Sequence, residues 1–189
     1  MKILFIGNSY TYYNDMPKLF EAECKKNGVC ADVESITAGG YRLLQFLSDD
    51  DEYGRLVKKT LDQTRFDYVV LQEQSVYPVT ETETFFKCVS ELTALIKANG
   101  AKPVLYETWG RADGSEALTR LGLSHDEMQI KLKEAYETAA KKTDAIPVYA
   151  GEKFHEAYRS GKAVFDPDGS HPSLLGSQIA AKEFYSTLF

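Results

Sequence analysis

Cysteine and histidine are scarce in this sequence of 189 residues, which contains three of each. The cysteines (Cys24, Cys30 and Cys88) form no Cys-x-x-Cys pair, and their odd number argues against a disulfide framework. We expect all three to be small buried hydrophobic residues. The histidines are far apart along the chain and no His-Glu-x-x-His pattern occurs, so we predict neither a metal site nor a cofactor.

Concentrated positive charge and long apolar runs are also lacking. The formal net charge is −6 and the basic residues are dispersed, which excludes the basic stripe that a nucleic-acid partner requires. No apolar run is long enough to span a bilayer, and 3–6 is too short for the core of a signal peptide. Reduced thiols suit the cytoplasm, whereas a secreted or periplasmic chain that had lost its signal peptide would have the same sequence. No oligomeric state is predicted.

Short apolar segments alternate with stretches of helical periodicity along the chain. The segments predicted as strands are 2–6, 32–36, 68–71, 102–106 and 146–149. Residues 85–96 have apolar side chains at helical spacing, Ser124 and Glu127 form a capping-box pattern, and a last helix covers about 173–188. This alternation predicts one α/β domain over residues 1–189, with helices on both faces of a parallel sheet.

Polar residues and glycines follow the predicted strands. In parallel sheets of this kind, ligands bind beyond the carboxyl ends of the strands. Ser9 follows the first strand, Gly40 the second, Gln72 and Gln74 the third, and Trp109 the fourth. We therefore expect a hydroxyl, backbone N–H groups and amides to meet at one edge of the sheet. Acyl transfer requires these groups, as nucleophile and as donors to an oxyanion.

Two of the three histidines have ordinary structural explanations. His125 lies in the first turn of the helix capped by Ser124, where we expect a solvated structural role. His155 lies beside Phe154 and Tyr158, which form an apolar pair at helical spacing. Neither is favoured as a catalytic base.

His171 is the candidate general base. Pro172 biases it away from helical conformation, so we expect it on the turn before the last helix. Asp168, three residues earlier, can reach back to the imidazole Nδ1, fixing the tautomer in which Nε2 accepts a proton from a serine hydroxyl. Together with Ser9, these residues have the chemistry of a Ser-His-Asp esterase.

Given these residues, the chain resembles the GDSL-type esterases of the SGNH hydrolase superfamily. Four segments carry the resemblance: 6–9, 40–44, 67–74 and 168–173. It implies a three-layer α/β sandwich with a five-stranded parallel, flavodoxin-like sheet. It also implies that Ser9, His171 and Asp168 are catalytic, and that the N–H groups of Ser9 and Gly40 form part of the oxyanion hole.

The chain departs from the family pattern at two positions. Asn8 replaces the usual aspartate of Gly-Asp-Ser, at a position outside the catalytic groups. In the third segment, the family has an asparagine whose side chain helps to hold the oxyanion. This chain offers Gln74 or, failing that, Gln72. We favour Gln74 because it lies further past the end of the strand.

Aromatic and arginine side chains beside the strand ends are candidate substrate contacts, namely Tyr10, Tyr41, Trp109 and Arg111. From the family resemblance and this aromatic content, we predict hydrolysis of a small acyl ester through an acyl-enzyme. An O-acetyl group on a carbohydrate is the favoured example, and an acyltransferase would use the same groups. The alternative is a non-catalytic flavodoxin-like domain that binds a ligand or glycan.

Overall fold

A parallel sheet lies at the centre of the computed structural model, which describes all residues from 1 to 189. Its strands are β1 (Lys2–Gly7), β2 (Asp32–Thr37), β3 (Tyr68–Leu71), β4 (Lys102–Tyr106) and β5 (Ile146–Val148). The order across the sheet is β2-β1-β3-β4-β5, and every neighbouring pair is parallel. This flavodoxin-like order confirms the predicted fold and puts a topological switch point at the carboxyl end of β1.

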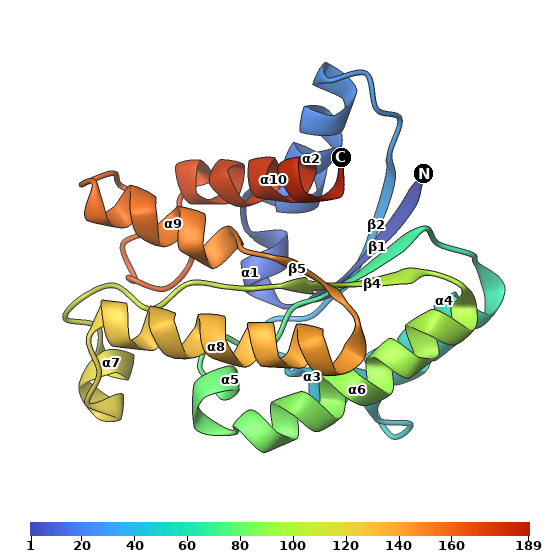
Figure 1. The fold of residues 1–189 in the computed structure, drawn as a ribbon, viewed down its shortest axis with the longest axis horizontal. Helices are drawn as coiled ribbons and strands as arrows, with labels where there is room; N and C mark the ends of the chain where they lie inside the picture. Colours follow the sequence, from blue (N-terminus) through green and yellow to red (C-terminus); the bar gives the residue numbers. More distant parts are fainter.

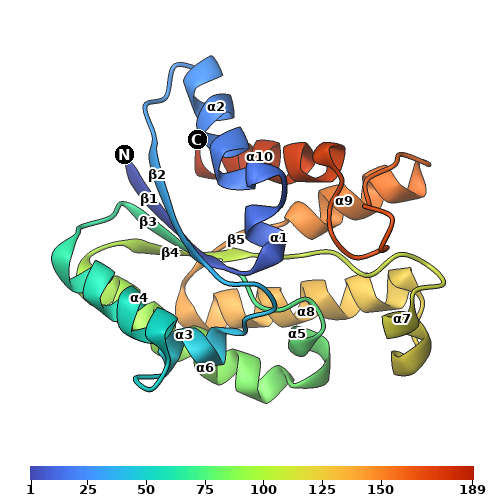
Figure 2. The ribbon, with the colours of Figure 1, turned by 180° about the vertical axis from the view of Figure 1, so that it is seen from behind.

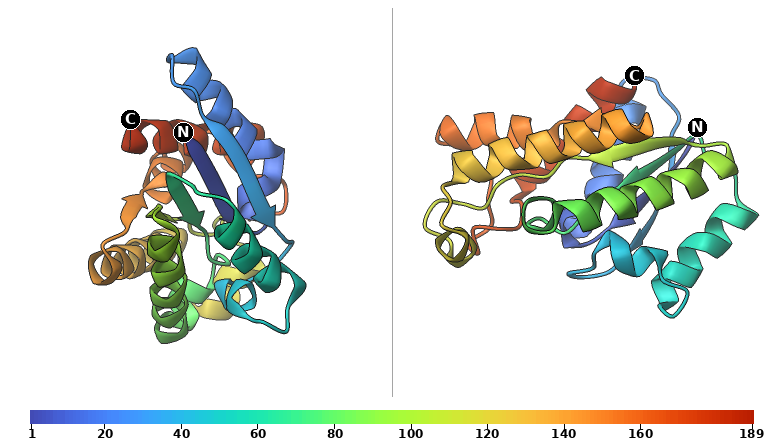
Figure 3. Two further views of the ribbon diagram at one scale, coloured as in Figure 1. Left: turned by 90° about the vertical axis from the view of Figure 1, so that its right-hand side faces the viewer. Right: turned by 60° about the horizontal axis from the view of Figure 1, so that its bottom comes forward.

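Helices cover both faces of the sheet (Figures 1 and 2). One face carries α2 (Met16–Lys26), α9 (Ala150–Arg159) and α10 (Leu174–Leu188). The other carries α3 (Leu43–Leu47), α4 (Glu52–Gln63), α6 (Thr82–Asn99) and α8 (His125–Thr143). The remaining helices are short: α1 (Ser9–Tyr12), η1 (Tyr13–Asp15), α5 (Tyr77–Thr80) and α7 (Glu116–Leu121). The side views in Figure 3 show the resulting three layers.

Strand β1 is buried on both faces because its side chains alternate between two cores. Ile3 and Phe5 point to the core under α2 and α10, whereas Leu4 and Ile6 point to the core under α6 and α8. The Phe5 ring packs edge-on against Phe184 of α10, with ring centroids 5.1 Å apart. Burial on both faces fixes the position of β1, and hence of the residues that follow it.

Most of the local predictions are confirmed. Ser124 and Glu127 form the predicted capping box of α8, and Ser173 caps α10. Two of the three cysteines are buried, but Cys30 is exposed because it lies in the loop between α2 and β2, so the prediction of burial is wrong there. None of the helices combines the length and the hydropathy that crossing a bilayer requires.

Candidate active site

Ser9 is the first residue of α1, just beyond the end of β1. Its neighbour Asn8 caps this helix: Asn8 Oδ1 accepts from the N–H of Tyr10 (3.1 Å), and Nδ2 donates to the carbonyl oxygen of Tyr41 (2.8 Å). An aspartate cannot make the second bond, because a carboxylate has no proton to donate. The asparagine in Gly-Asn-Ser therefore ties the Ser9 loop to the loop after β2, which contains Gly40.

Gln72 is buried against the end of β1, and both the oxygen and the nitrogen of its amide make hydrogen bonds. Its Oε1 accepts from the N–H of Asn8 (2.8 Å) and the hydroxyl of Thr11 (2.9 Å), while its Nε2 donates to the carbonyl oxygen of Glu73 (2.5 Å). A Cβ at Gly7 would lie 2.6 Å from Gln72 Oε1, so glycine is required there. Gln72 therefore supports the loop that carries the serine, and its side chain has no exposed surface from which to reach a ligand.

His171 lies between Asp168 and Ser9 in a continuous hydrogen-bonded chain. The imidazole Nδ1 is 2.5 Å from Asp168 Oδ2, and Nε2 is 2.8 Å from Ser9 Oγ. Asp168 Oδ1 accepts from the backbone N–H groups of Ser170 and His171, both at 2.9 Å, which fixes the carboxylate in the turn before α10. Since the carboxylate accepts from Nδ1, the lone pair of Nε2 faces the Ser9 hydroxyl.

The electrostatics of this turn favour a charged Asp168. Partial burial by itself would raise the pKa of the carboxyl, but the hydrogen bonds from the side chain and backbone of His171 lower the pKa below its ordinary value. The carboxylate is therefore ionised at neutral pH. It holds the Nδ1–H tautomer and would stabilise an imidazolium.

Aromatic rings hold the imidazole of His171 in place. Tyr13 stacks on it with centroids 4.1 Å apart and planes 13° from parallel, and Tyr10 meets it edge-on at 5.5 Å. The Tyr10 hydroxyl shares a hydrogen bond with Ser170 Oγ (2.8 Å), and Trp109 Nε1 donates to the Ser170 carbonyl (3.0 Å). The four substrate contacts predicted from the sequence do not include Tyr13. Its place in the run of tyrosines directly after Ser9 was the available signal.

Three groups in the loops after β1, β2 and β3 are candidate donors to an oxyanion. The N–H groups of Ser9 and Gly40 donate to no backbone carbonyl. Gly40 has a φ of +71°, which glycine adopts without strain. The Oε1 atom of Gln74 accepts from the N–H of Val76 (3.0 Å), which leaves its Nε2 donors without a partner in the protein. Of the two glutamines, only Gln74 has an amide nitrogen that makes no hydrogen bond in the protein.

Glu73 is a buried carboxyl group between these two glutamines. It is 2% exposed, and it accepts from the N–H groups of Gln74 (2.6 Å) and Leu43 (3.2 Å). Burial raises its pKa to about 7, although these hydrogen bonds oppose the shift. Glu73 therefore joins the loop after β3 to the start of α3, a role that sequence reasoning missed because no local pattern marks it.

Two of the predicted substrate contacts are wrong because their side chains are buried. Trp109 has no exposed surface and Tyr10 is 3% exposed. The Trp109 ring stacks between Tyr10 and Phe154, at centroid separations of 5.0 and 4.1 Å. Trp109 packs beneath the turn that contains Ser170 and His171, so these stacked rings support the turn and do not line the site.

Tyr41 and Arg111 are half-buried and remain near the surface. The Tyr41 hydroxyl donates to Asp51 Oδ2 (3.2 Å), at the start of α4. Arg111 Nη2 donates to Ser75 Oγ (2.7 Å), and its buried Nε has no partner in the protein. Arg111 therefore joins the loops after β3 and β4 and keeps a donor unpaired.

The other two histidines pair with each other rather than with the triad residues. His125 is fully buried, so the prediction of a solvated role is wrong. Its Nδ1 is 2.8 Å from the carbonyl oxygen of Arg111, and its Nε2 is 2.9 Å from Nδ1 of His155. Separation along the sequence concealed this contact, which forms only when α8 and α9 pack together.

Comparison with solved structures places the chain in a family. A protein from Slackia heliotrinireducens that is assigned as an SGNH hydrolase matches 100% of this chain and 99% of its own, with a TM-score of 0.90 and 34% identity. The chain belongs to the SGNH hydrolases. It is accordingly an enzyme of the serine ester hydrolase class. Neither a family model nor a curated protein matches it.

Two other solved structures share the fold at lower identity. The acetyl xylan esterase AlAXEase matches 100% of both chains with a TM-score of 0.68 and 15% identity. A variant of an acetyl-xylooligosaccharide esterase from Geobacillus matches 98% of this chain and 93% of its own, with a TM-score of 0.67 and 17% identity. At these identities the similarity establishes the fold alone.

Proposed function

We propose that Ser9, His171 and Asp168 are the catalytic triad of an esterase that removes a small acyl group. The observation that carries the proposal is the pair of short contacts from one imidazole, 2.8 Å to Ser9 Oγ and 2.5 Å to Asp168 Oδ2. These are the contacts that proton transfer from a serine nucleophile requires.

The reaction proceeds in two steps. Ser9 Oγ attacks the ester carbonyl while His171 Nε2 takes the hydroxyl proton, and the imidazolium then gives that proton to the leaving alcohol. Water attacks the acyl-serine in the second step, again with His171 as base, and releases the carboxylic acid and free Ser9. Asp168 stays ionised throughout and stabilises the imidazolium.

The oxyanion formed in each step would be held by three donors. These are the backbone N–H groups of Ser9 and Gly40 and the side-chain amide of Gln74. The proposal for Gln74 is supported by its unpaired Nε2 and by the complete burial of Gln72, whose amide holds the serine loop. A donor of this kind contributes about 3 kcal/mol to transition-state stabilisation.

A short acyl group fits the packing below Ser9. The face-to-face rings of Tyr10, Trp109 and Phe154 fill the space beneath the serine loop and have almost no exposed surface. The exposed Tyr12 and the half-buried Tyr13 leave aromatic surface available to a sugar ring. The two acetyl-sugar esterases with this fold support an O-acetyl carbohydrate as the substrate class.

Turnover of p-nitrophenyl acetate by the wild type and by Ser9→Ala and His171→Ala tests the triad. We expect both variants to lose activity by about 10³-fold or more. Variants as active as the wild type would exclude the assignment. A complete lack of wild-type turnover on every ester tested would favour a non-catalytic binding domain.

A substrate panel tests the acyl group separately. We expect kcat/KM to fall as the acyl chain of p-nitrophenyl esters lengthens from two to eight carbons, and acetylated xylo-oligosaccharides to be deacetylated. Faster hydrolysis of the eight-carbon ester would contradict the argument from packing while leaving the triad assignment intact.

A further inference from the structure

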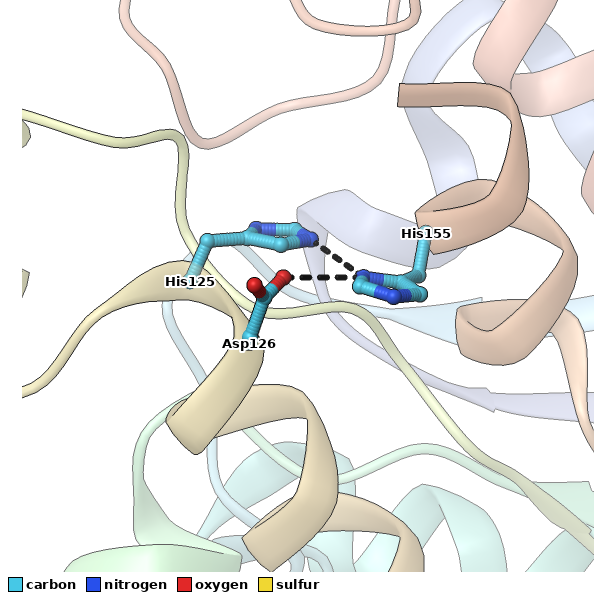
Figure 4. A group of neighbouring side chains, drawn as sticks. All are labelled: His125, Asp126 and His155. Carbon is cyan, nitrogen blue, oxygen red and sulfur yellow. Dashed lines mark hydrogen bonds and ion pairs between the residues drawn. The ribbon is translucent and has the colours of Figure 1, made fainter. Parts of the chain in front are cut away.

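A second group of chemically reactive side chains lies where α8 begins beside α9. It consists of His125, Asp126 and His155, whose ligand atoms all lie within 4.8 Å of one another. Figure 4 shows the two imidazole rings directed at each other, with the Asp126 carboxylate beside them. None of the three belongs to the proposed triad or oxyanion hole.

The tautomer of His125 is fixed by its surroundings. A backbone carbonyl can only accept, so the contact between His125 Nδ1 and the Arg111 oxygen (2.8 Å) places the ring proton on Nδ1. The lone pair of Nε2 then points at Nδ1 of His155, 2.9 Å away. An imidazole whose other nitrogen donates to a backbone carbonyl is the usual arrangement of a histidine that ligates a metal.

The second imidazole can present a lone pair to the same point. In the structure, His155 Nδ1 donates its proton to His125. If this proton resides instead on Nε2 of His155, the ring stays neutral and Nδ1 becomes a ligand.

Asp126 supplies an anionic oxygen to the same group. Its Oδ1 is 3.7 Å from Nδ1 of His155 and also accepts from Nε of Arg159 (2.6 Å). The guanidinium of Arg159 is shared with Asp113, at 2.6 Å from Oδ2. Two carboxylates thus face one guanidinium, and the surplus negative charge favours a further cation. Asp126 Oδ2 has no hydrogen-bond partner in the protein and can bind that cation while Arg159 stays in place.

We propose that His125 Nε2, His155 Nδ1 and the Asp126 carboxylate form a binding site for Zn²⁺. Two imidazoles and one carboxylate are a ligand set for Zn²⁺, with water as the fourth ligand, and are poorly suited to Mg²⁺ or Ca²⁺. Tetrahedral coordination with Zn–N bonds of about 2.0–2.1 Å places the two nitrogens about 3.3 Å apart. The 2.9 Å separation therefore has to open by a few tenths of an ångström, and both rings have to turn so that their lone pairs converge on the metal rather than on each other.

The site would stabilise the active-site loops rather than act on the substrate. His125 donates to the backbone carbonyl of Arg111, whose side chain bonds to Ser75. The backbone N–H of the next residue, Ala112, donates to the carbonyl of Gly169 (2.8 Å). Gly169 adjoins Asp168. A metal that joins α8 to α9 would restrict this loop and, through it, the turn that carries the proposed catalytic acid.

Calorimetric titration of the EDTA-treated full chain with ZnCl₂ tests the proposal. We expect one equivalent of Zn²⁺ to bind, and the melting temperature to rise by about 5–10 °C at a hundredfold excess over the dissociation constant. MgCl₂ should have no effect. Absence of zinc binding by the wild type would overturn the proposal.

Variants show whether the bound metal occupies this site. His155→Gln and Asp126→Asn change half-buried and exposed side chains, so they should fold, which circular dichroism would verify. Both should bind Zn²⁺ at least about tenfold more weakly. When Co²⁺ is added in place of Zn²⁺ as a spectroscopic probe, both should also lack the absorption bands of tetrahedral Co²⁺ that the wild type shows. The controls Cys30→Ser and His171→Gln remove an exposed thiol and the other accessible imidazole and should bind as the wild type does. Unchanged binding by His155→Gln, or loss of binding in either control, would refute the site.

Discussion

Substitution by alanine should affect the two glutamines after β3 in different ways, lowering kcat at Gln74 and the free energy of unfolding at Gln72. Gln74→Ala removes a free amide donor and one hydrogen bond, the one from the N–H of Val76. If that amide holds the oxyanion, kcat should fall by about 10²–10³-fold, while the free energy of unfolding should change by about 1 kcal/mol or less.

Gln72→Ala should act mainly on stability. This substitution removes three buried hydrogen bonds and leaves the N–H of Asn8 and the hydroxyl of Thr11 without their acceptor. At about 1 kcal/mol for each lost bond, with a further penalty for each buried group left unpaired, the protein should lose about 3–5 kcal/mol of stability. Residual activity should then track the fraction of folded protein.

Urea unfolding and p-nitrophenyl acetate kinetics measured on the same preparations separate the two effects. Gln74→Glu is a matched variant, because its carboxylate keeps the bond from Val76 but replaces the amide donor with a negative charge. It should be less active than Gln74→Ala. If Gln74→Ala keeps kcat within about twofold of the wild type, or if Gln74→Glu is fully active, the oxyanion assignment is wrong.

Three further predictions concern single carboxyl and amide groups. The raised pKa of Glu73 favours its neutral form in the folded protein, so its contribution to stability is complete below about pH 4.5 and is lost as the pH rises through about 7, an effect of about 3 kcal/mol. Glu73→Gln should abolish this loss in urea unfolding measured between pH 5 and pH 8, and an unchanged pH profile would contradict it. Asn8→Asp should destabilise the fold by about 1–3 kcal/mol at neutral pH, because a carboxylate would face the carbonyl of Tyr41; a melting temperature equal to that of the wild type would count against this. Asp168→Asn should reduce kcat on the order of 10³-fold with little change in KM, and a loss confined to KM would assign Asp168 to substrate binding.

The sequence predicted what depends on short-range spacing and strand order. Asp168 and His171 are three residues apart in one turn, so their contact can be predicted from the sequence alone. Ser9 and Gly40 follow strands that are adjacent in a parallel sheet, and this order brings them to the same edge. The positions of residues that local geometry places could therefore be predicted in advance, whereas their catalytic roles stay a proposal.

The predictions that were wrong depend on packing between distant segments. Trp109 follows a strand end, but whether its ring faces solvent depends on the turn around Ser170, more than sixty residues later. The pairing of His125 with His155 requires the contact between α8 and α9, which no periodicity reveals. The engagement of Gln72 was likewise invisible, because its partners follow a different strand.

Covalent labelling tests the central claim that Ser9 is the nucleophile. An organophosphate such as paraoxon transfers its phosphoryl group to an activated serine and loses its phenolate, which leaves a stable adduct that intact-mass spectrometry and peptide mapping can locate. We predict one adduct per chain on the peptide that contains Ser9, no adduct in Ser9→Ala, and much slower labelling of His171→Ala. An adduct on another residue, or equal labelling of Ser9→Ala and the wild type, would contradict the proposed mechanism.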